Sequence, residues 1–385
     1  MKILFYSHSS TAYGATTSMV DLIIGMKLLY PSIIVHVVLP NKGPLEEILL
    51  KESINYAVIP HKSWHYDSEL SARKKSENIF LWKLWFSKNK WQKKIFNFFY
   101  LRKHLEFAIS FTPDYIYINS SLAPMGTYVA THLKIPFIWH HRETVNDNAT
   151  HFFLEYPREF KSIFKKAELH IYTSQFLKSF YENLMPSFLS LEVFDGVRKK
   201  EESHSRKIPE YMGVIRLGLV GRVNTQKGQK EVIEVFKKLK NPEKYELHII
   251  GGGDLKYIKN ICGLGNDFKN IIYHGFLSKK IIFDQFDFLI MNSKNEAFGR
   301  VVAEANFYGI PAIAKKSGAL TEIIKNNKTG FLYDTPEELL QILSDIEKFD
   351  IEQYKILSIA ALDHFKENFN IEDHTIKIVE KIKNL

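Results

Sequence analysis

The stretch NSKNEAFGRVVAEANFYGIPAIA, residues 292–314, carries a polar loop, a helix and a strand in succession. The apolar run FLIM ends just before it at Met291, and helical periodicity begins near Phe298 or Gly299. A second short apolar run follows near 312–314. This order of strand, loop, helix and strand is the repeating unit of a parallel α/β sheet.

The same alternation continues through the whole chain of 385 residues, a length that suits two domains. Residues 198–213 are charged, contain a proline and lack apolar periodicity, as a linker does. We therefore predict two doubly wound α/β domains, 1–197 and 214–368, and a final helix, 369–385, that packs on the first domain. Strands are expected near residues 3–6, 33–39, 56–59, 115–118, 137–139, 169–173, 189–194, 215–220, 246–250, 271–273, 288–291, 312–314 and 330–332.

The composition is that of a soluble globular protein, with 45% hydrophobic and 25% charged residues. The opening residues lack the long apolar region of a signal peptide, and no strongly apolar run reaches the roughly 18 residues that a membrane-spanning helix needs. The single cysteine, Cys262, excludes a disulfide or a thiolate metal cage within one chain. We expect it to be a small buried apolar residue in a cytoplasmic protein.

Two glutamates and a set of backbone amides mark the helix start in the opening stretch. Glu296 lies in the loop, and Glu304 lies inside the helix among apolar neighbours. The N–H groups of Phe298, Gly299 and Arg300 precede the helical hydrogen bonds, so they can bind a phosphate. Two interpretations are open: a pair of glutamates that bind hydroxyls of a nucleotide-sugar, or a helix-starting acid followed by a solvated one.

A second strand-to-helix turn lies in LGLVGRVNTQKGQKEVIEVF, residues 217–236. Arg222 and Lys227 are two cations in a glycine-bounded loop, which suits a diphosphate because that group needs charge neutralisation and close backbone approach. The loop is neither a Walker A loop nor a dinucleotide fingerprint. LHIIGGGDL, which contains Gly252, also lacks the GxGxxG spacing, so a ligand contact and a tight turn without a ligand are alternatives there.

Four polar residues follow an apolar run in IPFIWHHRETVND, residues 135–147. They are His140, His141, Arg142 and Glu143, at the edge where a parallel sheet opens toward a ligand. An ordinary salt-bridged loop is the alternative. A metal site is not expected, because neither a D-x-D motif nor a further cluster of ligands accompanies them.

The turn after the first strand lies in STAYGATTSMVDLI, residues 10–23. Gly14 and Ala15 come between the strand and the helix, where backbone amides can approach a phosphate. Small residues are common in turns of this kind, so the pattern alone predicts only a point of close backbone approach.

An aromatic and basic segment without a single acid lies between Glu77 and Glu106. It holds seven Lys or Arg residues and three of the five tryptophans of the chain. One interpretation is a solvated helical hairpin with a few core aromatics. The other is a surface over 79–104 that meets anionic lipid headgroups, with lysines supplying charge and aromatics entering the interface. Nucleic acid is not expected as a partner, because no binding motif accompanies the charge.

Taken together, these motifs resemble family 4 of the retaining glycosyltransferases, or group 1 glycosyl transferases, whose members have the GT-B fold of two Rossmann-like domains facing across a cleft. The resemblance spans most of the C-terminal half and is looser in the N-terminal half. It rests on EAFGRVVAE at 296–304, GRVNTQKG at 221–228, HIIGGGD at 248–254, HGF at 274–276, SGALTEII and TGFLYD within 317–334, YGA at 13–15 and WHHRE at 139–143.

The resemblance implies a role for each matching residue. Arg222 and Lys227 would bind the donor diphosphate and stabilise the leaving group. Glu304 would hydrogen-bond the ribose, and Glu296 would contact the donor sugar. Further donor contacts are implied for Gly14, Ala15, Gly252, Phe298, Gly299 and Arg300, and sugar or acceptor contacts for His141, Arg142 and Glu143.

The family has a histidine near the transferred sugar, and here His140 and His141 compete for that role. His140 is favoured because WH-x-RE is a familiar variant. Two departures from the family pattern leave the sugar pocket open. The usual glycine pair in the C-terminal half is Gly318-Ala319, and the first loop reads Gly-Ala-Thr instead of Gly-Gly-Ala-Glu.

The resemblance implies transfer with retention of the anomeric configuration, without a required metal or other cofactor. No carboxylate nucleophile can be named, so we expect front-face attack by the acceptor hydroxyl with the leaving phosphate as base. Arg222 and Lys227 would supply the charge that the departing diphosphate needs.

We therefore predict a retaining hexosyltransferase that uses a nucleotide-sugar donor, with a UDP-sugar favoured over a GDP- or ADP-sugar. The acceptor would be a glycan or a lipid-linked glycan in surface polysaccharide or glycolipid synthesis, and the location cytoplasmic, peripheral at the inner face of the membrane. The alternatives are another GT-B sugar-nucleotide enzyme, such as an epimerase, and a non-catalytic sugar-nucleotide-binding protein.

Overall fold

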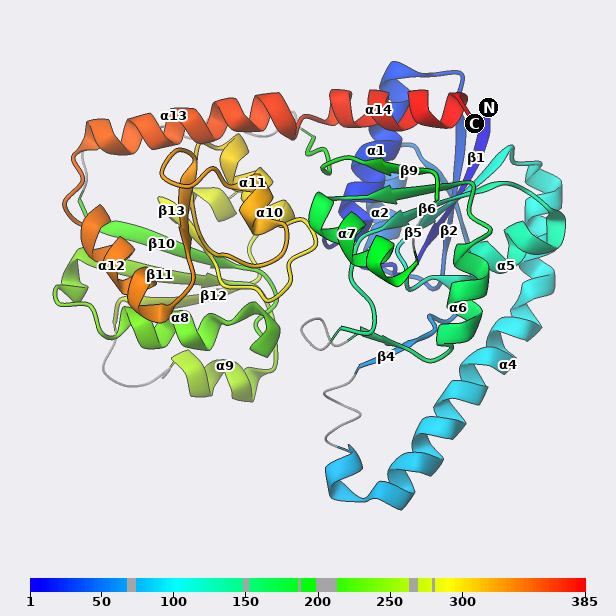
Figure 1. Cartoon of the computed structure of the whole chain (residues 1–385), viewed down its shortest axis with the longest axis horizontal. Coiled ribbons are helices and arrows are strands. Elements are labelled where there is room, and N and C mark those ends of the chain that lie inside the picture. Colours follow the sequence, from blue (N-terminus) through cyan, green and yellow to red (C-terminus); the bar gives the residue numbers. More distant parts are fainter. Residues whose placement is uncertain (68–73, 148–151, 186–187, 199–212, 263–268, 279–280) are drawn as a thin grey trace. The chain divides into compact units, whose positions relative to one another are not determined.

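The computed structural model describes residues 1–67, 74–147, 152–185, 188–198, 213–262, 269–278 and 281–385. These residues form two compact units (Figure 1). The first unit comprises Met1–Gly196 and Ile371–Leu385, and the second comprises Val197–Asn370. The linker predicted over 198–213 lies outside the described residues except at its two ends.

The first unit is built on a seven-stranded sheet in the order β3-β2-β1-β5-β6-β8-β9, with every pair parallel. The strand order reverses between the adjacent strands β1 and β5. Such a reversal opens a crevice at the carboxyl ends of the two strands. The strands are β1 (Lys2–Ser7), β2 (Ile34–Leu39), β3 (Asn55–Val58), β5 (Tyr115–Asn119), β6 (Phe137–His141), β8 (Leu169–Tyr172) and β9 (Ser190–Glu192).

The C-terminal helix α14 (Ile371–Lys383) packs on α1 (Ala15–Leu29) in this unit. Gly25 allows the contact, because a Cβ there would lie 2.1 Å from the Thr375 hydroxyl oxygen. Ile378 of α14 then joins the same buried apolar cluster as Ile23 of α1. The remaining short helices are α2 (Leu45–Lys51), α5 (Pro124–Leu133), α6 (Pro157–Phe164) and α7 (Gln175–Leu184).

A single 33-residue helix, α4 (Ile79–Phe111), extends from the body of the first unit (Figure 1). The Asn78 side chain caps it by accepting hydrogen bonds from two backbone N–H groups. No glycine or proline interrupts it, so the helical hairpin offered as one interpretation is wrong. Its N-terminal half contacts a small antiparallel pair that the sequence did not predict, β4 (His65–Asp67) with β7 (Phe152–Leu154). Among the helices of the described segments, none combines the length and the apolar character needed to cross a membrane.

The second unit contains a six-stranded parallel sheet in the order β12-β11-β10-β13-β14-β15. Its strands are β10 (Ile215–Val220), β11 (Tyr245–Ile250), β12 (Ile271–Gly275), β13 (Phe288–Met291), β14 (Ala312–Lys315) and β15 (Gly330–Tyr333), all near predicted positions. Its α-helices are α8 (Gln229–Phe236), α9 (Leu255–Cys262), α10 (Arg300–Phe307), α11 (Leu320–Ile323), α12 (Pro336–Ile346) and α13 (Ile351–Asn368).

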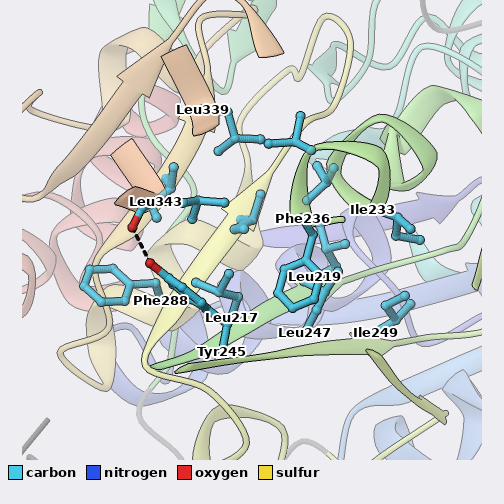
Figure 2. Close-up of a cluster of buried hydrophobic side chains, with 14 of the residues drawn as sticks. Leu217, Leu219, Ile233, Phe236, Tyr245, Leu247, Ile249, Phe288, Leu339 and Leu343 are labelled. Atoms are coloured by element: carbon cyan, nitrogen blue, oxygen red, sulfur yellow. Dashed lines mark hydrogen bonds between the residues drawn. The ribbon is translucent and has the colours of Figure 1, made fainter. Parts of the chain in front are cut away.

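Apolar side chains from the strands and from α8 and α12 form the core of the second unit (Figure 2). Leu217 and Leu247 come from neighbouring strands, and Phe236 packs on them from α8. Tyr245 brings a hydroxyl into this core and satisfies it by donating to the Leu343 carbonyl at 2.6 Å. Cys262 is buried in the same cluster, as expected for a small apolar residue.

The contact between α1 and α14 can be tested with Gly25→Ala. Helix propensity alone would stabilise the variant by about 0.5–1 kcal/mol, but the clash with Thr375 should destabilise the first unit by about 1–3 kcal/mol. Urea unfolding of the full chain measures the change. Gly25→Ala combined with Thr375→Ala removes the closest clashing atom and should recover much of the loss. A more stable single variant would contradict the close packing.

Candidate functional site

The strand order of the second sheet reverses between β10 and β13, and several of the predicted donor-site residues lie in the loops that follow these strands. Ligands of doubly wound sheets bind at such a point, outside the carboxyl ends of the strands. Residues 221–228 follow β10, and residues 292–299 follow β13. The two loops are hydrogen-bonded to each other, since the Lys294 N–H donates to the Gln226 carbonyl at 3.1 Å.

The structure brings Lys227 and Glu296 together as an ion pair across these two loops. The Lys227 Nζ lies 2.7 Å from the Glu296 Oε2. Lys227 ends a short 3₁₀ turn, η1 (Thr225–Lys227), which the Asn224 side chain caps by accepting from the Lys227 N–H at 3.0 Å. Both side chains keep partial exposure, 34% for the lysine and 19% for the glutamate, so a ligand can reach them.

The pKa of Glu296 is lowered although the group is largely enclosed. Burial raises this pKa, but the charge of Lys227, its hydrogen bond and donors from Ser293 and the Gly299 N–H together outweigh burial. Glu296 is therefore a carboxylate at neutral pH. The Gly299 amide already donates to Glu296, so of the three amides expected to bind phosphate, this one has a partner within the protein.

The loop after β14 packs closely against the loop that carries Glu296. Gly318 adopts φ +58°, and a Cβ there would lie 2.3 Å from the Glu296 carbonyl oxygen. The Ala319 N–H donates to the same carbonyl at 2.8 Å. Ala319 itself has φ −69°, a conformation open to any residue, so replacing the second glycine of the family pair leaves this backbone unstrained.

The start of α10 holds the other residues of the opening motif. Gly299 adopts φ +87° at the N-cap, and Phe298 is buried with its ring 5.9 Å from that of Phe369. The Arg300 Nε lies 3.0 Å from the Glu304 Oε1, one turn along the helix. Arg300 therefore positions the Glu304 carboxylate through its side chain, a role that the sequence did not predict.

Arg222 and Gly252 lie in adjacent loops of the same sheet edge. Arg222 is exposed after β10. The Val223 N–H donates to the Gly252 carbonyl at 2.8 Å, which joins the loops after β10 and β11. A Cβ at Gly252 would lie 2.3 Å from the Phe276 ring, so the ring covers this glycine closely. That contact accounts for Gly252 without a ligand, and a donor contact there stays a prediction.

Sequence reasoning assigned no role to Asn292, the first residue after β13, which connects several elements. Its amide donates to the Gly228 carbonyl at 3.0 Å and to Glu231 at 2.6 Å. Its amide oxygen accepts from the Tyr333 hydroxyl at 3.0 Å, and Lys315 lies 3.2 Å from Glu231. The position of Asn292 directly after a buried strand was the available signal. Its partners come from the lysine loop, from α8 and from β15, so no local pattern identifies them.

At the carboxyl edge of the first sheet, His140 belongs to a buried polar network. Its Nδ1 lies 2.6 Å from the Tyr117 hydroxyl and 3.2 Å from an Arg142 nitrogen. Arg142 also donates to Asn119 at 2.9 Å and forms an ion pair with Asp195. Burial, with the Arg142 charge, places the pKa of His140 well below its usual value, so the ring is neutral. The His140 Nε2 has no hydrogen-bond partner among the described residues.

His141 points to the opposite face of β6 and has a different environment. Its Nδ1 lies 2.7 Å from the Ser121 hydroxyl, and its Nε2 lies 3.0 Å from the His170 Nδ1. Its ring stacks on those of His170 and Tyr172. Both ring nitrogens are thus engaged, and the ring packs against other aromatic rings. The structure therefore separates the two histidines that the sequence left in competition.

Glu143 follows these residues and titrates near neutrality. Its Oε1 accepts hydrogen bonds from the Ser120 hydroxyl at 2.8 Å and the Ser121 N–H at 2.6 Å. Burial raises its pKa to about 7, against the opposing effect of these donors and of Arg142. The group can therefore hold or release a proton near neutral pH.

The predicted glycine turn lies at the point where the strand order of the first sheet reverses. Gly14 caps α1 with φ +44°, and a Cβ there would meet no atom within 4 Å, so the turn is open on that side. The Asn119 side chain, at the end of β5, donates to the Ala15 carbonyl at 3.0 Å. The turn after β1 is thus fixed to the neighbouring strand at the position expected for a ligand crevice.

Two doubly wound α/β units, each with polar residues at its strand reversal, are the two domains of the GT-B fold. Residues 200–362 match the family "Glycosyl transferases group 1". This C-terminal part of the chain is similar to that family, in agreement with the resemblance seen in the motifs.

Known proteins similar to this chain include glycosyltransferases. It is 29% identical over 157 residues to an uncharacterized 41.2 kDa protein in the cps region of Klebsiella pneumoniae, covering 40% of this chain and 41% of that one. It is 25% identical over 235 residues to a lipopolysaccharide 1,2-N-acetylglucosaminetransferase of Salmonella typhimurium, covering 56% and 61%. These curated relatives are thus matched over less than two thirds of their length. The crystal structure of Anabaena Alr3699/HepE in complex with UDP-glucose superposes with a TM-score of 0.77, 19% identity and full coverage of both chains, which shows the fold.

The buried neutral histidines of the first unit predict a loss of stability in mild acid. Burial lowers the pKa of His8 to about 4 and of His104 and His170 to about 3. These rings stay neutral when folded, while an unfolded chain binds protons below pH about 6.5. The free energy of unfolding should therefore fall as pH drops below about 6.5, by up to about 1.4 kcal/mol per pH unit for each histidine.

Urea unfolding at a series of pH values measures this slope. His104→Leu should make it shallower by the share of one histidine. His132→Asn, at an exposed site, is the matched control and should leave it unchanged. Equal slopes for the parent and for His104→Leu would contradict the assignment of a buried neutral ring.

Proposed function

We propose that this chain is a retaining glycosyltransferase that moves a sugar from a nucleotide-sugar donor to a glycan or lipid-linked glycan. The observation that carries the proposal is the Lys227–Glu296 ion pair at the strand reversal of the second sheet. A cation and an ionised carboxylate 2.7 Å apart at this position offer one group to phosphate oxygens and one to sugar hydroxyls.

Each of these groups would contact a different part of the donor. Lys227 and the exposed Arg222 would neutralise the diphosphate and stabilise it as the leaving group. Glu296, freed from part of its contact with Lys227, would accept hydrogen bonds from the sugar. Glu304 would accept from the ribose, with Arg300 holding its carboxylate at 3.0 Å.

We propose a UDP-sugar as the donor, with GDP- and ADP-sugars as the alternatives. The solved structure of HepE contains UDP-glucose, and another similar structure is of a lipopolysaccharide outer core galactosyltransferase, WaaB. The reaction would need neither a metal nor another cofactor, because two cationic side chains and backbone donors can stabilise the departing diphosphate. Retention would arise from front-face attack, with the leaving phosphate as base.

The first unit would contribute a neutral imidazole and a carboxyl group. The His140 Nε2 lacks a partner within the described protein, whereas both His141 nitrogens are engaged, which supports His140 as the sugar contact. Glu143, with a pKa raised to about 7 by burial, would contact an acceptor hydroxyl. We propose a cytoplasmic location, peripheral at the inner face of a membrane, which would suit a lipid-linked acceptor.

The central prediction concerns Lys227→Ala and Glu296→Gln. Each removes a group placed at the reacting part of the donor, so kcat should fall about 10²–10³-fold for either variant. A screen of UDP-, GDP- and ADP-sugars by donor hydrolysis and transfer measures this and also identifies the base. Lys230→Ala, an exposed neighbour on α8, is the control and should keep parental turnover.

Near-parental turnover in either variant, with intact folding, would contradict the proposed site. Tight donor binding without hydrolysis or transfer by the parent would favour the non-catalytic alternative, and a changed sugar configuration on an intact nucleotide-sugar would favour the epimerase.

A separate prediction concerns metal. Turnover should be unchanged by excess EDTA, because Arg222 and Lys227 supply the charge at the diphosphate. Steady-state transfer rates with EDTA and with added Mg²⁺ or Mn²⁺ test this. Loss of turnover in EDTA that a divalent cation restores would show that the two side chains do not suffice.

A further inference from the structure

One face of α4 exposes large apolar side chains along several turns of the helix. Trp91 is 61% exposed, Phe98 74% and Phe99 73%. Leu84, Trp91 and Phe98 are spaced seven apart, which places them on one side of a helix. We call this set the α4 apolar stripe; it consists of Leu84, Trp91, Ile95, Phe98 and Phe99.

Basic side chains flank this stripe, and acids lie beyond its two ends at Glu77 and Glu106. Lys88 lies one turn from Leu84 and from Trp91. Arg102 lies one turn from Phe98 and also pairs with Glu106 at 2.8 Å. The sequence 78–105 holds seven Lys or Arg residues and no Asp or Glu. An apolar stripe bordered by one sign of charge is the pattern of a helix that lies on an anionic membrane surface.

A pocket of about 410 Å³ opens beside Trp91. Its six lining residues are Phe86, Ser87, Lys90, Trp91, Lys94 and Tyr156, two of them lysines and none an acid. The Nζ atoms of Lys90 and Lys94 lie 4.7 and 5.1 Å from the Tyr156 ring centroid. The Tyr156 hydroxyl donates to the Lys90 carbonyl at 2.6 Å, which ties this ring to α4. Lys94 also meets Glu159 at 3.4 Å.

We propose that the α4 apolar stripe and the lysine pocket beside it dock this chain on a membrane surface rich in anionic phospholipid. The aromatic side chains enter the interface, while Lys88, Lys90, Lys94 and Arg102 contact headgroup phosphates. A second copy of the chain fits this face less well, because the lysines that line the pocket in one copy would meet the same lysines of the other.

This proposal deepens the proposed function, because it rests on a lipid-linked acceptor as the reason for membrane attachment. Docking by α4 would bring the first unit to the bilayer without a membrane-spanning segment. It is independent of donor chemistry, because none of the α4 residues belongs to the proposed donor site.

Vesicle binding of the full chain tests the proposal. Phosphatidylcholine vesicles with and without phosphatidylglycerol are sedimented with the protein at low salt and at about 0.5 M NaCl, where surface charge is screened. A triple variant should partition onto the anionic vesicles about 100-fold more weakly, which corresponds to about fivefold for each cation removed. Its substitutions are Lys88→Gln, Lys90→Gln and Lys94→Gln. Trp91→Ser with Phe98→Ser should weaken partitioning about tenfold or more for each aromatic.

Two matched controls carry the same changes on exposed positions of the second unit. Lys237→Gln, Lys238→Gln and Lys240→Gln remove three cations, and Ile356→Ser with Ile359→Ser removes two exposed apolar side chains. Both should bind vesicles as the parent does. A vesicle-induced change in tryptophan emission should also disappear in Trp91→Phe.

Donor hydrolysis in solution separates this proposal from the proposed function. The α4 variants should hydrolyse the donor at the parental rate while losing vesicle binding. Parental vesicle binding by the α4 variants, or equal binding to neutral and anionic vesicles, would overturn the proposal and leave the donor site untouched. A dimer in sedimentation velocity that Trp91→Ser with Phe98→Ser dissolves, without vesicle binding, would overturn it in favour of a second copy.

Discussion

The ion pair between Lys227 and Glu296 joins the two loops on which the proposed donor site of the second unit depends. Without the lysine, a carboxylate enclosed at this sheet edge would be costly, because burial alone raises its pKa. The surrounding backbone is arranged to keep this carboxylate in place. Gly318 approaches the Glu296 backbone closely, and Asn292 fixes the Gly228 carbonyl at the far end of the lysine loop. A ligand phosphate would therefore meet a preformed pair of charges.

The carboxyl edge of the first sheet carries a different arrangement of charges, in which the ion pair is buried. Arg142 is buried and forms an ion pair with Asp195, and the same guanidinium contacts the His140 ring. Burial lowers the pKa of His140, and the nearby Arg142 lowers it further, since protonation of the ring would place two positive charges together. Glu143 is the residue after Arg142, and burial raises the pKa of its carboxyl group to about 7. The edge of the second sheet thus presents a partly exposed pair of charges, whereas the edge of the first sheet holds a buried ion pair, a neutral imidazole and a carboxyl group that titrates near neutral pH.

The helices α4 and α14 of the first unit differ in whether their apolar faces are covered. The apolar face of α14 is buried on α1, where Gly25 makes room for Thr375. The apolar stripe of α4 stays exposed, although its side chains are as large as those of a protein core. Exposed aromatic side chains in such a cluster have a free-energy cost in water, and they mark a surface that meets another phase or molecule. The positive charge of the flanking lysines favours the approach of anionic partners to this surface.

Much of the fold was predictable because parallel strands leave short apolar runs at regular intervals, and each predicted strand has its counterpart near the expected residues. Lys227 and Glu296 could be proposed as site residues since each lies in a polar loop after such a run. The choice between His140 and His141 could not be made in this way. Both faces of a central parallel strand are buried, so alternation gives no sign of which face carries the site. The same limit applies to Gly252 under Phe276 and to the partners of Asn292. These depend on which loops the sheet order brings together, and that information belongs to the topology and not to any one segment.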